Sequence, residues 1–287
     1  MNWFAYASLC ALSIGTADAL TKKALKSNDT YFMAWVRFGF AAPFMATLFP
    51  FIEVPQLDSP FFLITFLLLP LDIIALLLYL KAIRISPLSL TLPFLSLTPV
   101  FLIGTSYIIL GELPDKTGVI GIMLVATGAY LLNVHTVHLG ILGPIKAIGK
   151  ERGSVLMIVV AFLFSITSIL GKIAVQHSNP TFFAVFYSFL LSFSLFFIIQ
   201  FKTKRIVSKI VSQPLLFLFI GICMAIMMLT HLKAISLVEV SYMISVKRMS
   251  LLLGVVYGTL FFKERNIKER FLGSATMILG IVLISLF

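Results

Sequence analysis

Charged side chains are scarce in this sequence, and their scarcity excludes a soluble fold. Only 11% of the 287 residues are Asp, Glu, Lys or Arg, whereas 60% are hydrophobic; soluble domains carry about 25% charged residues. We therefore expect an all-α integral membrane protein, with the bilayer as its surroundings. The net charge of +11 comes mostly from short connectors, where cations face lipid headgroups, so no nucleic-acid partner is expected.

Cysteines and catalytic motifs are also lacking. Cys10 and Cys223 both lie inside apolar runs, so neither a disulfide framework nor a metal site is indicated. The sequence has no HExxH motif, no Ser-His spacing on one helix face and no pair of catalytic carboxylates. These absences argue against an enzyme, and no cofactor is expected.

Long apolar runs fill the chain instead. A segment of about 20 residues spans the hydrocarbon core. We expect ten transmembrane helices, at 3–24, 31–52, 60–82, 88–110, 117–134, 154–176, 181–201, 214–235, 238–262 and 268–287. The connectors leave no room for a soluble domain, so any function must reside among the helices or at their ends.

An internal repeat relates the two halves of the chain. Leu80-Lys81-Ala82-Ile83 recurs 152 positions later as Leu232-Lys233-Ala234-Ile235, and the same offset matches Glu112 to Glu264 without a gap. The repeat unit contains five helices, an odd number, so the second copy crosses the membrane in the opposite direction. We expect two inverted five-helix repeats, at 1–135 and 154–287, joined by a basic connector at 136–153.

Lys and Arg residues are distributed unevenly between the two sides. Sixteen lie after odd-numbered helices, whereas the opposite side holds three, Lys116, Lys172 and Lys233. The positive-inside rule places the odd connectors in the cytoplasm. The sequence therefore predicts a multi-pass protein of the plasma or inner membrane, with both termini outside.

Three stretches carry a family resemblance: AWVRFGF at 34–40, PLSLTLPFLSLTPVFLIGTSYIILGE at 87–112 and SVKRMSLLLGVVYGTLFFKE at 245–264. With the two repeats, they resemble the EamA family of the drug/metabolite transporter superfamily. The resemblance implies a secondary carrier, monomeric or homodimeric, that moves small metabolites through a central cavity. Amino-acid export is common among assigned members, and proton coupling is frequent but not universal.

Alternative functions remain open at this point. The superfamily also contains organic-phosphate and nucleotide-sugar exchangers, some with a Lys-Arg pair in the ninth helix. A membrane scaffold or receptor that transports nothing is a more remote alternative. The residue types alone do not choose among these.

Cations within the spans are the first candidates for solute contact. Lys247 and Arg248 lie near the middle of the ninth expected helix, about 13 to 15 Å from either interface, which is too far for a side chain to reach headgroups. They either line a water-filled cavity that attracts an anionic solute or are held in buried pairs. Arg37, nearer a helix end, either lines the same cavity or extends outward.

Buried acids and a histidine are the candidates for proton coupling. Asp72 lies at the centre of the third helix, where a carboxylate must either carry a proton or pair with a cation such as Arg37. Asp18 is a second candidate, although a pair with Lys22, four residues on, is favoured. His231 is expected to be a packing residue more often than a proton relay.

Prolines and aromatic residues complete the candidate site. Helices two to four contain interior prolines that the second half lacks, and these are expected to bend helices and free carbonyl groups, at Pro43, Pro70, Pro93 and Pro99. Aromatic residues with a polar tip are expected to line the cavity, at Trp35, Tyr79, Tyr242 and Tyr257.

Overall fold

The computed structural model describes residues 2–86, 91–131, 152–253 and 267–285, and within these ranges the chain is helical and contains no strand. The first half contains α1 (Trp3–Ala24), α2 (Thr30–Gly39), α3 (Ala42–Ala46), the 3₁₀ turn η1 (Phe49–Phe51), α4 (Ser59–Ile85), the 3₁₀ turn η2 (Leu92–Ser96), α6 (Leu97–Leu110) and α7 (Lys116–Leu131). The second half contains α9 (Arg152–Gln176), α10 (Pro180–Lys202), α11 (Ile206–Ser212), α12 (Pro214–Ile235), α13 (Val240–Lys247) and α15 (Ile267–Ser285).

Four helices begin at a side-chain cap. The carboxylate or amide oxygens of Asn2, Asp29, Asp58 and Asn179 each accept the backbone N–H three residues further on, at 2.6 to 3.0 Å. Such caps satisfy one of the N–H groups that a helix leaves unpaired at its start. They fix the starts of α1, α2, α4 and α10 at the ends of the bundle.

Five of the described helices are long and apolar enough to cross a membrane: α1, α4, α9, α10 and α12. Shorter apolar helices cover 94–110, 116–129 and 272–285. The chain is therefore a multi-pass membrane protein, while the count of ten spans stays a prediction. Several expected features lie outside the described residues, namely most of the connector 136–153, Tyr257 and Glu264.

The second expected span, 31–52, is not one continuous helix. Helix α2 ends at Gly39, a turn follows at residues 40 and 41, and α3 begins at Ala42 with Pro43 in its first turn. Proline lacks the N–H that would continue the hydrogen-bond ladder, which accounts for a break at this point. The span is thus divided into α2, α3 and η1.

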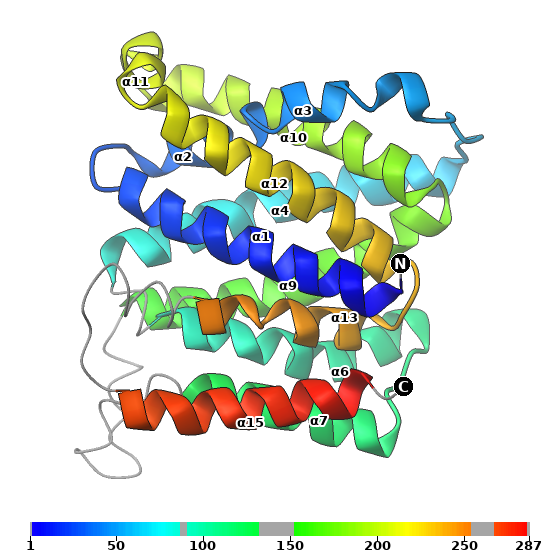
Figure 1. The fold of residues 1–287 in the computed structure, drawn as a ribbon. Helices are drawn as coiled ribbons and strands as arrows, with labels where there is room; N and C mark the ends of the chain where they lie inside the picture. Colours follow the sequence, from blue (N-terminus) through cyan, green and yellow to red (C-terminus); the bar gives the residue numbers. More distant parts are fainter. Residues whose placement is uncertain (1, 87–90, 132–151, 254–266, 286–287) are drawn as a thin grey trace.

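The two halves pack against each other in a symmetric pattern (Figure 1). Helix α1 lies along α12, and its counterpart in the second half, α9, lies along α4. Counterpart helices also meet directly, in the pairs α2 with α10, α6 with α13, and α7 with α15. Exchanging the halves reproduces each of these contacts, as the two-repeat sequence pattern requires.

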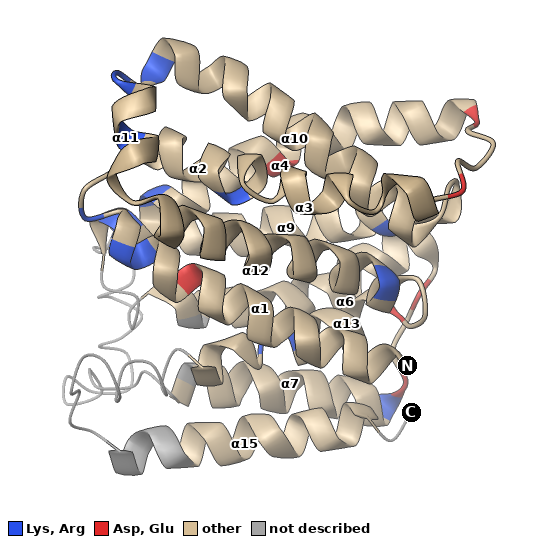
Figure 2. Cartoon of the chain, turned by 45° about the horizontal axis from the view of Figure 1, so that its top comes forward, with Lys and Arg blue, Asp and Glu red and all other residues tan. Residues whose placement is uncertain are grey.

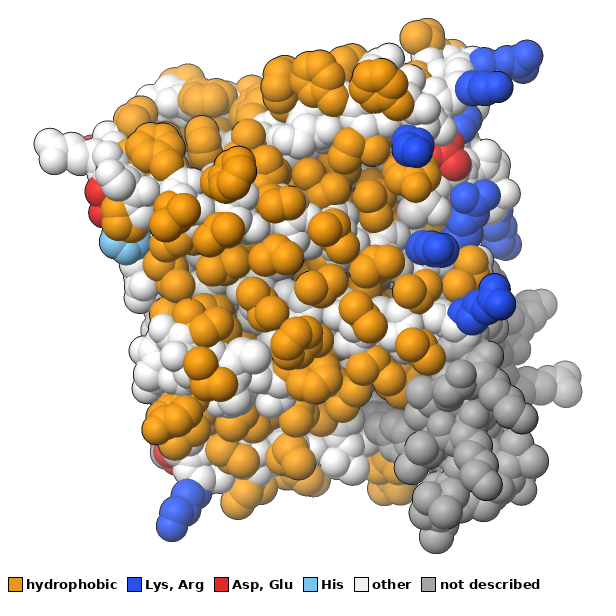
Figure 3. Space-filling model, turned by 180° about the vertical axis from the view of Figure 1, so that it is seen from behind, with side chains coloured by type: hydrophobic (Ala, Val, Ile, Leu, Met, Phe, Trp, Pro, Cys, Tyr) orange, Lys and Arg blue, Asp and Glu red, His pale blue; other side chains and the backbone are white. Residues whose placement is uncertain are grey.

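Most exposed charged side chains lie at the two ends of the bundle, and the cations are concentrated at one of these ends (Figure 2). We call the end where α1 begins and the termini lie the termini end, and the opposite end the basic end. Exposed cations of the basic end are Lys23, Lys26, Lys81, Arg84, Lys202, Lys204 and Arg205. Between the ends, apolar side chains cover the face shown in Figure 3, as contact with lipid requires.

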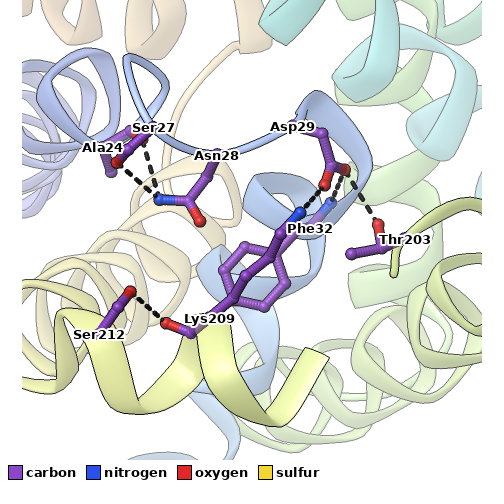
Figure 4. A network of polar contacts seen from close by, with 8 residues as sticks. All are labelled: Ala24, Ser27, Asn28, Asp29, Phe32, Thr203, Lys209 and Ser212. Atoms are coloured by element: carbon purple, nitrogen blue, oxygen red, sulfur yellow. Dashed lines mark hydrogen bonds and ion pairs between the residues drawn. The ribbon is translucent and has the colours of Figure 1, made fainter. Parts of the chain in front are cut away.

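A polar network joins the two halves at the basic end (Figure 4). The Asp29 carboxylate, at the start of α2, forms an ion pair with Lys209 of α11 and accepts a 2.9 Å hydrogen bond from the Thr203 hydroxyl. The Lys209 ammonium also lies 5.6 Å from the centre of the Phe32 ring. This network ties the α1–α2 connector to the α10–α12 connector.

Acidification is expected to weaken this network. Burial raises the pKa of Asp29, but hydrogen bonds from Lys209, the Phe32 N–H and Thr203 outweigh it and hold the pKa below the ordinary 3.8. A lowered pKa contributes stability above the unfolded value and loses it as pH falls through the folded value. Asp29→Asn should therefore lower the thermal stability at neutral pH, by less than about 1 kcal/mol. The difference from the parent should disappear below pH 3.8; a difference independent of pH would contradict this assignment.

Candidate functional site

Helix α13 breaks at the two candidate cations. It ends at Lys247, Arg248 and Met249 form a turn, and helical structure resumes at 250–253. The turn is closed by bonds between residues three apart, among them Met249 N–H to Val246 C=O and Leu251 N–H to Arg248 C=O, both 2.9 Å. The sequence suggested that Lys247 and Arg248 are successive positions of a continuous helix. In the structure the helix is interrupted at these two residues.

The first half has an irregularity at the matching place. The offset of 152 pairs Arg248 with Ser96, the last residue of the 3₁₀ turn η2. The fourth helix of each repeat, at 88–110 and 238–262, thus changes its hydrogen-bond pattern at corresponding positions. Discontinuous helices within the membrane are tolerated where they are buried in protein or line a cavity, and carriers use them for solute and ion sites.

Arg248 extends from this break toward the first half. Its side chain is buried, and its Nη2 donates a 2.8 Å hydrogen bond to the Thr98 hydroxyl of α6. Among the described residues, its Nε–H has no acceptor. A guanidinium bonded to a neutral hydroxyl keeps its full positive charge, which remains available to an anion.

Arg37 has a carboxylate partner instead. Its Nη1 lies 2.7 Å from Asp18 Oδ1, with side-chain exposures of 3% and 13%, and its guanidinium lies 5.8 Å from the centre of the Tyr79 ring. The expected pair of Asp18 with Lys22 is therefore wrong: Arg37 packs across from α2, and the Lys22 ammonium donates to backbone carbonyls of Ile83 and Ser86 at the end of α4.

Lys247 keeps accessible surface within an otherwise buried segment. The seven residues before it in α13 are all buried, whereas Lys247 is half-buried. Its ammonium lies within electrostatic range of Cys10 and Asp18 on α1 and of Asp72 on α4. Since Cys10 is fully buried, Lys247 points into the helix bundle rather than toward lipid.

Asp72 is bound by a tyrosine that the sequence did not indicate. The Tyr187 hydroxyl of α10 donates a 2.9 Å hydrogen bond to Asp72 Oδ2. In the described part of the chain, no ion pair within 4.0 Å involves Asp72. Asp72 is thus hydrogen-bonded to neutral hydroxyl groups, those of Tyr187 and Thr167, and lies within electrostatic range of Lys247.

The remaining candidates lie at different depths. His231 of α12 is half-buried near Lys247 and Arg248, and its Nδ1 has no partner among the described residues. Trp35 packs against Phe32, Phe40 and Phe196, away from the charged groups. Tyr242 lies near the termini end, where its hydroxyl donates to Asp115 Oδ1 at 2.7 Å. The structure therefore brings Arg37, Tyr79, Arg248, Lys247, Asp18, Asp72 and His231 together and leaves Trp35 and Tyr242 apart.

The prolines differ in their setting. Pro43 and Pro70 are exposed, and Pro70 lies inside the continuous helix α4. Pro99 is buried near the start of α6, and Pro93 is the second residue of η2. Pro93 and Pro99 flank the irregular segment opposite Arg248.

The termini end also holds acids whose pKa values are shifted: burial and the neighbouring Glu112 raise the pKa of Glu239, while hydrogen bonds from Tyr242 and the Gly118 N–H lower that of Asp115.

Two comparisons identify the fold and the family. The chain superposes on a solved structure, described only as the crystal structure of a protein, with a TM-score of 0.78 and 14% identity, covering 99% of this chain and 98% of the other. This likeness defines a shared fold. The EamA-like transporter family matches residues 1–134 and 151–286, so the chain belongs to that family and is a membrane transporter of the drug/metabolite type. No curated protein matches the chain.

Proposed function

We propose that the chain is a secondary carrier that works by alternating access and exports amino acids or related carboxylate-bearing solutes. The supporting observation is an excess of positive charge in the central cluster, by which we mean Arg37, Tyr79, Arg248, Lys247, Asp18, Asp72 and His231. Asp18 compensates Arg37, whereas Arg248 has a hydroxyl partner and Lys247 has no ion pair within 4.0 Å among the described residues. Buried charges require compensation, and a solute carboxylate would supply it at the break in α13.

Flux in proteoliposomes tests this proposal. A carrier should give saturable uptake of a carboxylate-bearing solute, and protein-free vesicles should not. A scaffold or receptor predicts no flux. The organic-phosphate alternative is separated by loading the vesicles with unlabelled solute: an obligatory exchanger requires this internal counter-substrate, whereas a net exporter transports without it.

Asp72 is proposed to carry the coupling proton. Its position within electrostatic range of Lys247, with hydrogen bonds from the neutral hydroxyls of Tyr187 and Thr167, suits a carboxyl group that changes charge during transport. Asp72→Asn should then give flux that no longer responds to a pH gradient. Tyr187→Phe is the matched control, because it removes one hydrogen bond to Asp72 but keeps the titratable group, and it should retain coupling. An unchanged pH response in Asp72→Asn would leave Asp72 a structural residue.

The orientation in the membrane is proposed from the exposed charges at the two ends of the bundle. We propose that the basic end faces the cytoplasm and that both termini face outward, because exposed cations gather at the basic end. The division into two five-helix units at 1–135 and 154–287, a total of ten spans, and a monomeric or homodimeric state belong to this proposal. Cysteine labelling of the N-terminus from outside intact cells would test the orientation.

A further inference from the structure

The connection between α10 and α12 combines exposed cations with exposed apolar side chains. We call residues 202–211, which include α11, the α11 segment; it contains four cations and no acid. Three of these cations are exposed and, among the described residues, form no ion pair within 4.0 Å: Lys202, Lys204 and Arg205. Figure 2 shows them at and beside α11, at the basic end. The segment therefore presents uncompensated positive charge at its surface.

The α11 segment lies at the border of the membrane. The two helices that it joins, α10 and α12, are both long and apolar enough to cross a membrane. On α11, Ile206 and Ile210 pack against the core, whereas Val207 and Val211 are 74% and 70% exposed. The two valines are four residues apart and lie on one side of the helix. Apolar side chains at this depth are shielded from water when they insert between lipids.

The turn that carries the cations is held in a strained conformation. Arg205 has φ 56° and ψ 47°, and among the described residues it is the only one other than glycine with a positive φ. Residues with a side chain rarely adopt this conformation, and it persists where the surrounding structure holds it. Here Thr203 and Lys209, on either side of the turn, both bind the Asp29 carboxylate (Figure 4). Lys204 and Arg205 are therefore presented on a fixed turn.

The matching connector of the first half is tied in the same way but carries the opposite charge. An offset of 150 relates Asp29 to Asn179 and Thr203 to Glu53, and Asn179 donates to the Glu53 carbonyl at 3.2 Å. Residues 52–58 of that connector contain two acids and no cation. The repeat thus fixes such a connector without cations, so the cations of the α11 segment need another explanation.

We propose that the α11 segment binds the headgroup of an anionic phospholipid. The lipid phosphate pairs with Lys204 and Arg205, Lys202 adds to the positive potential, and the acyl chains pack against Val207 and Val211. A soluble anion would gain nothing from the exposed valines, so their place among the cations favours a lipid. The site goes beyond the proposed carrier activity and does not depend on which solute is carried.

Titration of the purified protein with phosphatidylglycerol in a neutral detergent tests the site. A ligand that binds the folded state raises the melting temperature, so the parent should show a saturable rise, and phosphatidylcholine should have less effect. Combining Lys202→Gln, Lys204→Gln and Arg205→Gln should weaken the apparent affinity for phosphatidylglycerol about ten-fold. Melting temperatures without lipid check that the variant is folded.

A matched control removes the same number of charges from the same end of the bundle. Lys23→Gln, Lys26→Gln and Lys81→Gln replace three exposed cations of α1, the α1–α2 connector and α4, and the combined variant should keep an affinity close to that of the parent. Combining Val207→Ser and Val211→Ser keeps every cation but should also weaken the lipid affinity, because the apolar contact is lost.

Arg205→Gly gives an independent test that carries little risk to folding. Glycine suits the positive φ at this position, so the turn is retained while one cation is removed. The affinity for phosphatidylglycerol should fall about five-fold. An unchanged affinity in this variant would contradict the proposed contact with the phosphate, and it would do so even if the triple variant did not fold.

Three further results would overturn the lipid site. Equal losses of affinity in the two triple variants would indicate a general response to net charge. Equal stabilisation of the parent by glycerol phosphate, a headgroup without acyl chains, would indicate a site for soluble anions. Tighter binding of polyglutamate than of phosphatidylglycerol would indicate an acidic protein partner. Lipid binding is measured here without any transported solute, so this experiment and the flux experiment can fail separately.

Discussion

Replacing Lys247 or Arg248 with alanine is expected to abolish solute flux while leaving a folded, monodisperse protein. Among the described residues, Arg248 Nε–H has no acceptor at the break in α13, and Lys247 keeps accessible surface within electrostatic range of Asp72. If a solute carboxylate pairs with these groups, truncating either one leaves that carboxylate buried without a partner. Such a loss costs about 2 to 5 kcal/mol, so flux should fall by roughly 30-fold or more.

The structure offers controls for this experiment. Arg84→Ala removes an exposed cation of the basic end and should leave flux close to that of the parent. Arg248→Lys keeps a positive charge but loses the planar guanidinium that bonds to Thr98, and should retain part of the activity. Parental flux in both alanine variants would remove the central cations from the solute site.

Asp18→Asn is expected to give the largest loss of stability. The Asp18–Arg37 pair is nearly inaccessible to solvent, with a 2.7 Å bond between Oδ1 and Nη1. Removing one partner of a buried pair leaves an uncompensated charge and costs about 3 to 5 kcal/mol. We therefore expect a clear decrease in the melting temperature in detergent, measured by tryptophan fluorescence or scattering.

A second variant separates lost charge balance from lost packing. Arg37→Gln combined with Asp18→Asn removes both charges and keeps two hydrogen-bonding side chains, so it should recover much of the stability lost in Asp18→Asn alone. If the double variant is as unstable as the sum of the single variants, the pair is not coupled, and Arg37 is stabilised mainly by its contact with the Tyr79 ring.

The division of the helices into two related halves could be predicted from the sequence because it follows from repetition. The match of Leu80-Lys81-Ala82-Ile83 to Leu232-Lys233-Ala234-Ile235 indicated two related halves, and the helices pack in the pairs that two such halves allow. Apolar length indicated a membrane protein for a similar reason, since the bilayer sets the length of a span.

The site could be predicted only in part, because its partners come from distant segments. The sequence showed that Lys247 and Arg248 are cations inside an apolar span. The interruption of the helix at these residues could not be predicted, because it depends on hydrogen bonds of the folded backbone. Sequence spacing favoured Lys22 as the partner of Asp18, yet Arg37 is nearer in space. Thr98 and Tyr187 carried no signal, since hydroxyl groups are common on helices and their partners lie more than a hundred residues away.

The most direct test of the account is a thermal-shift comparison of the parent with a variant carrying both Lys247→Ala and Arg248→Ala. Ligands that bind the folded state raise its apparent stability, so amino acids, organic acids, phosphorylated metabolites and neutral sugars can be screened side by side. We predict that a carboxylate-bearing solute raises the melting temperature of the parent and has no effect on the variant. Equal stabilisation of both proteins, or stabilisation of the parent by neutral sugars alone, would contradict a cationic solute site at the break in α13.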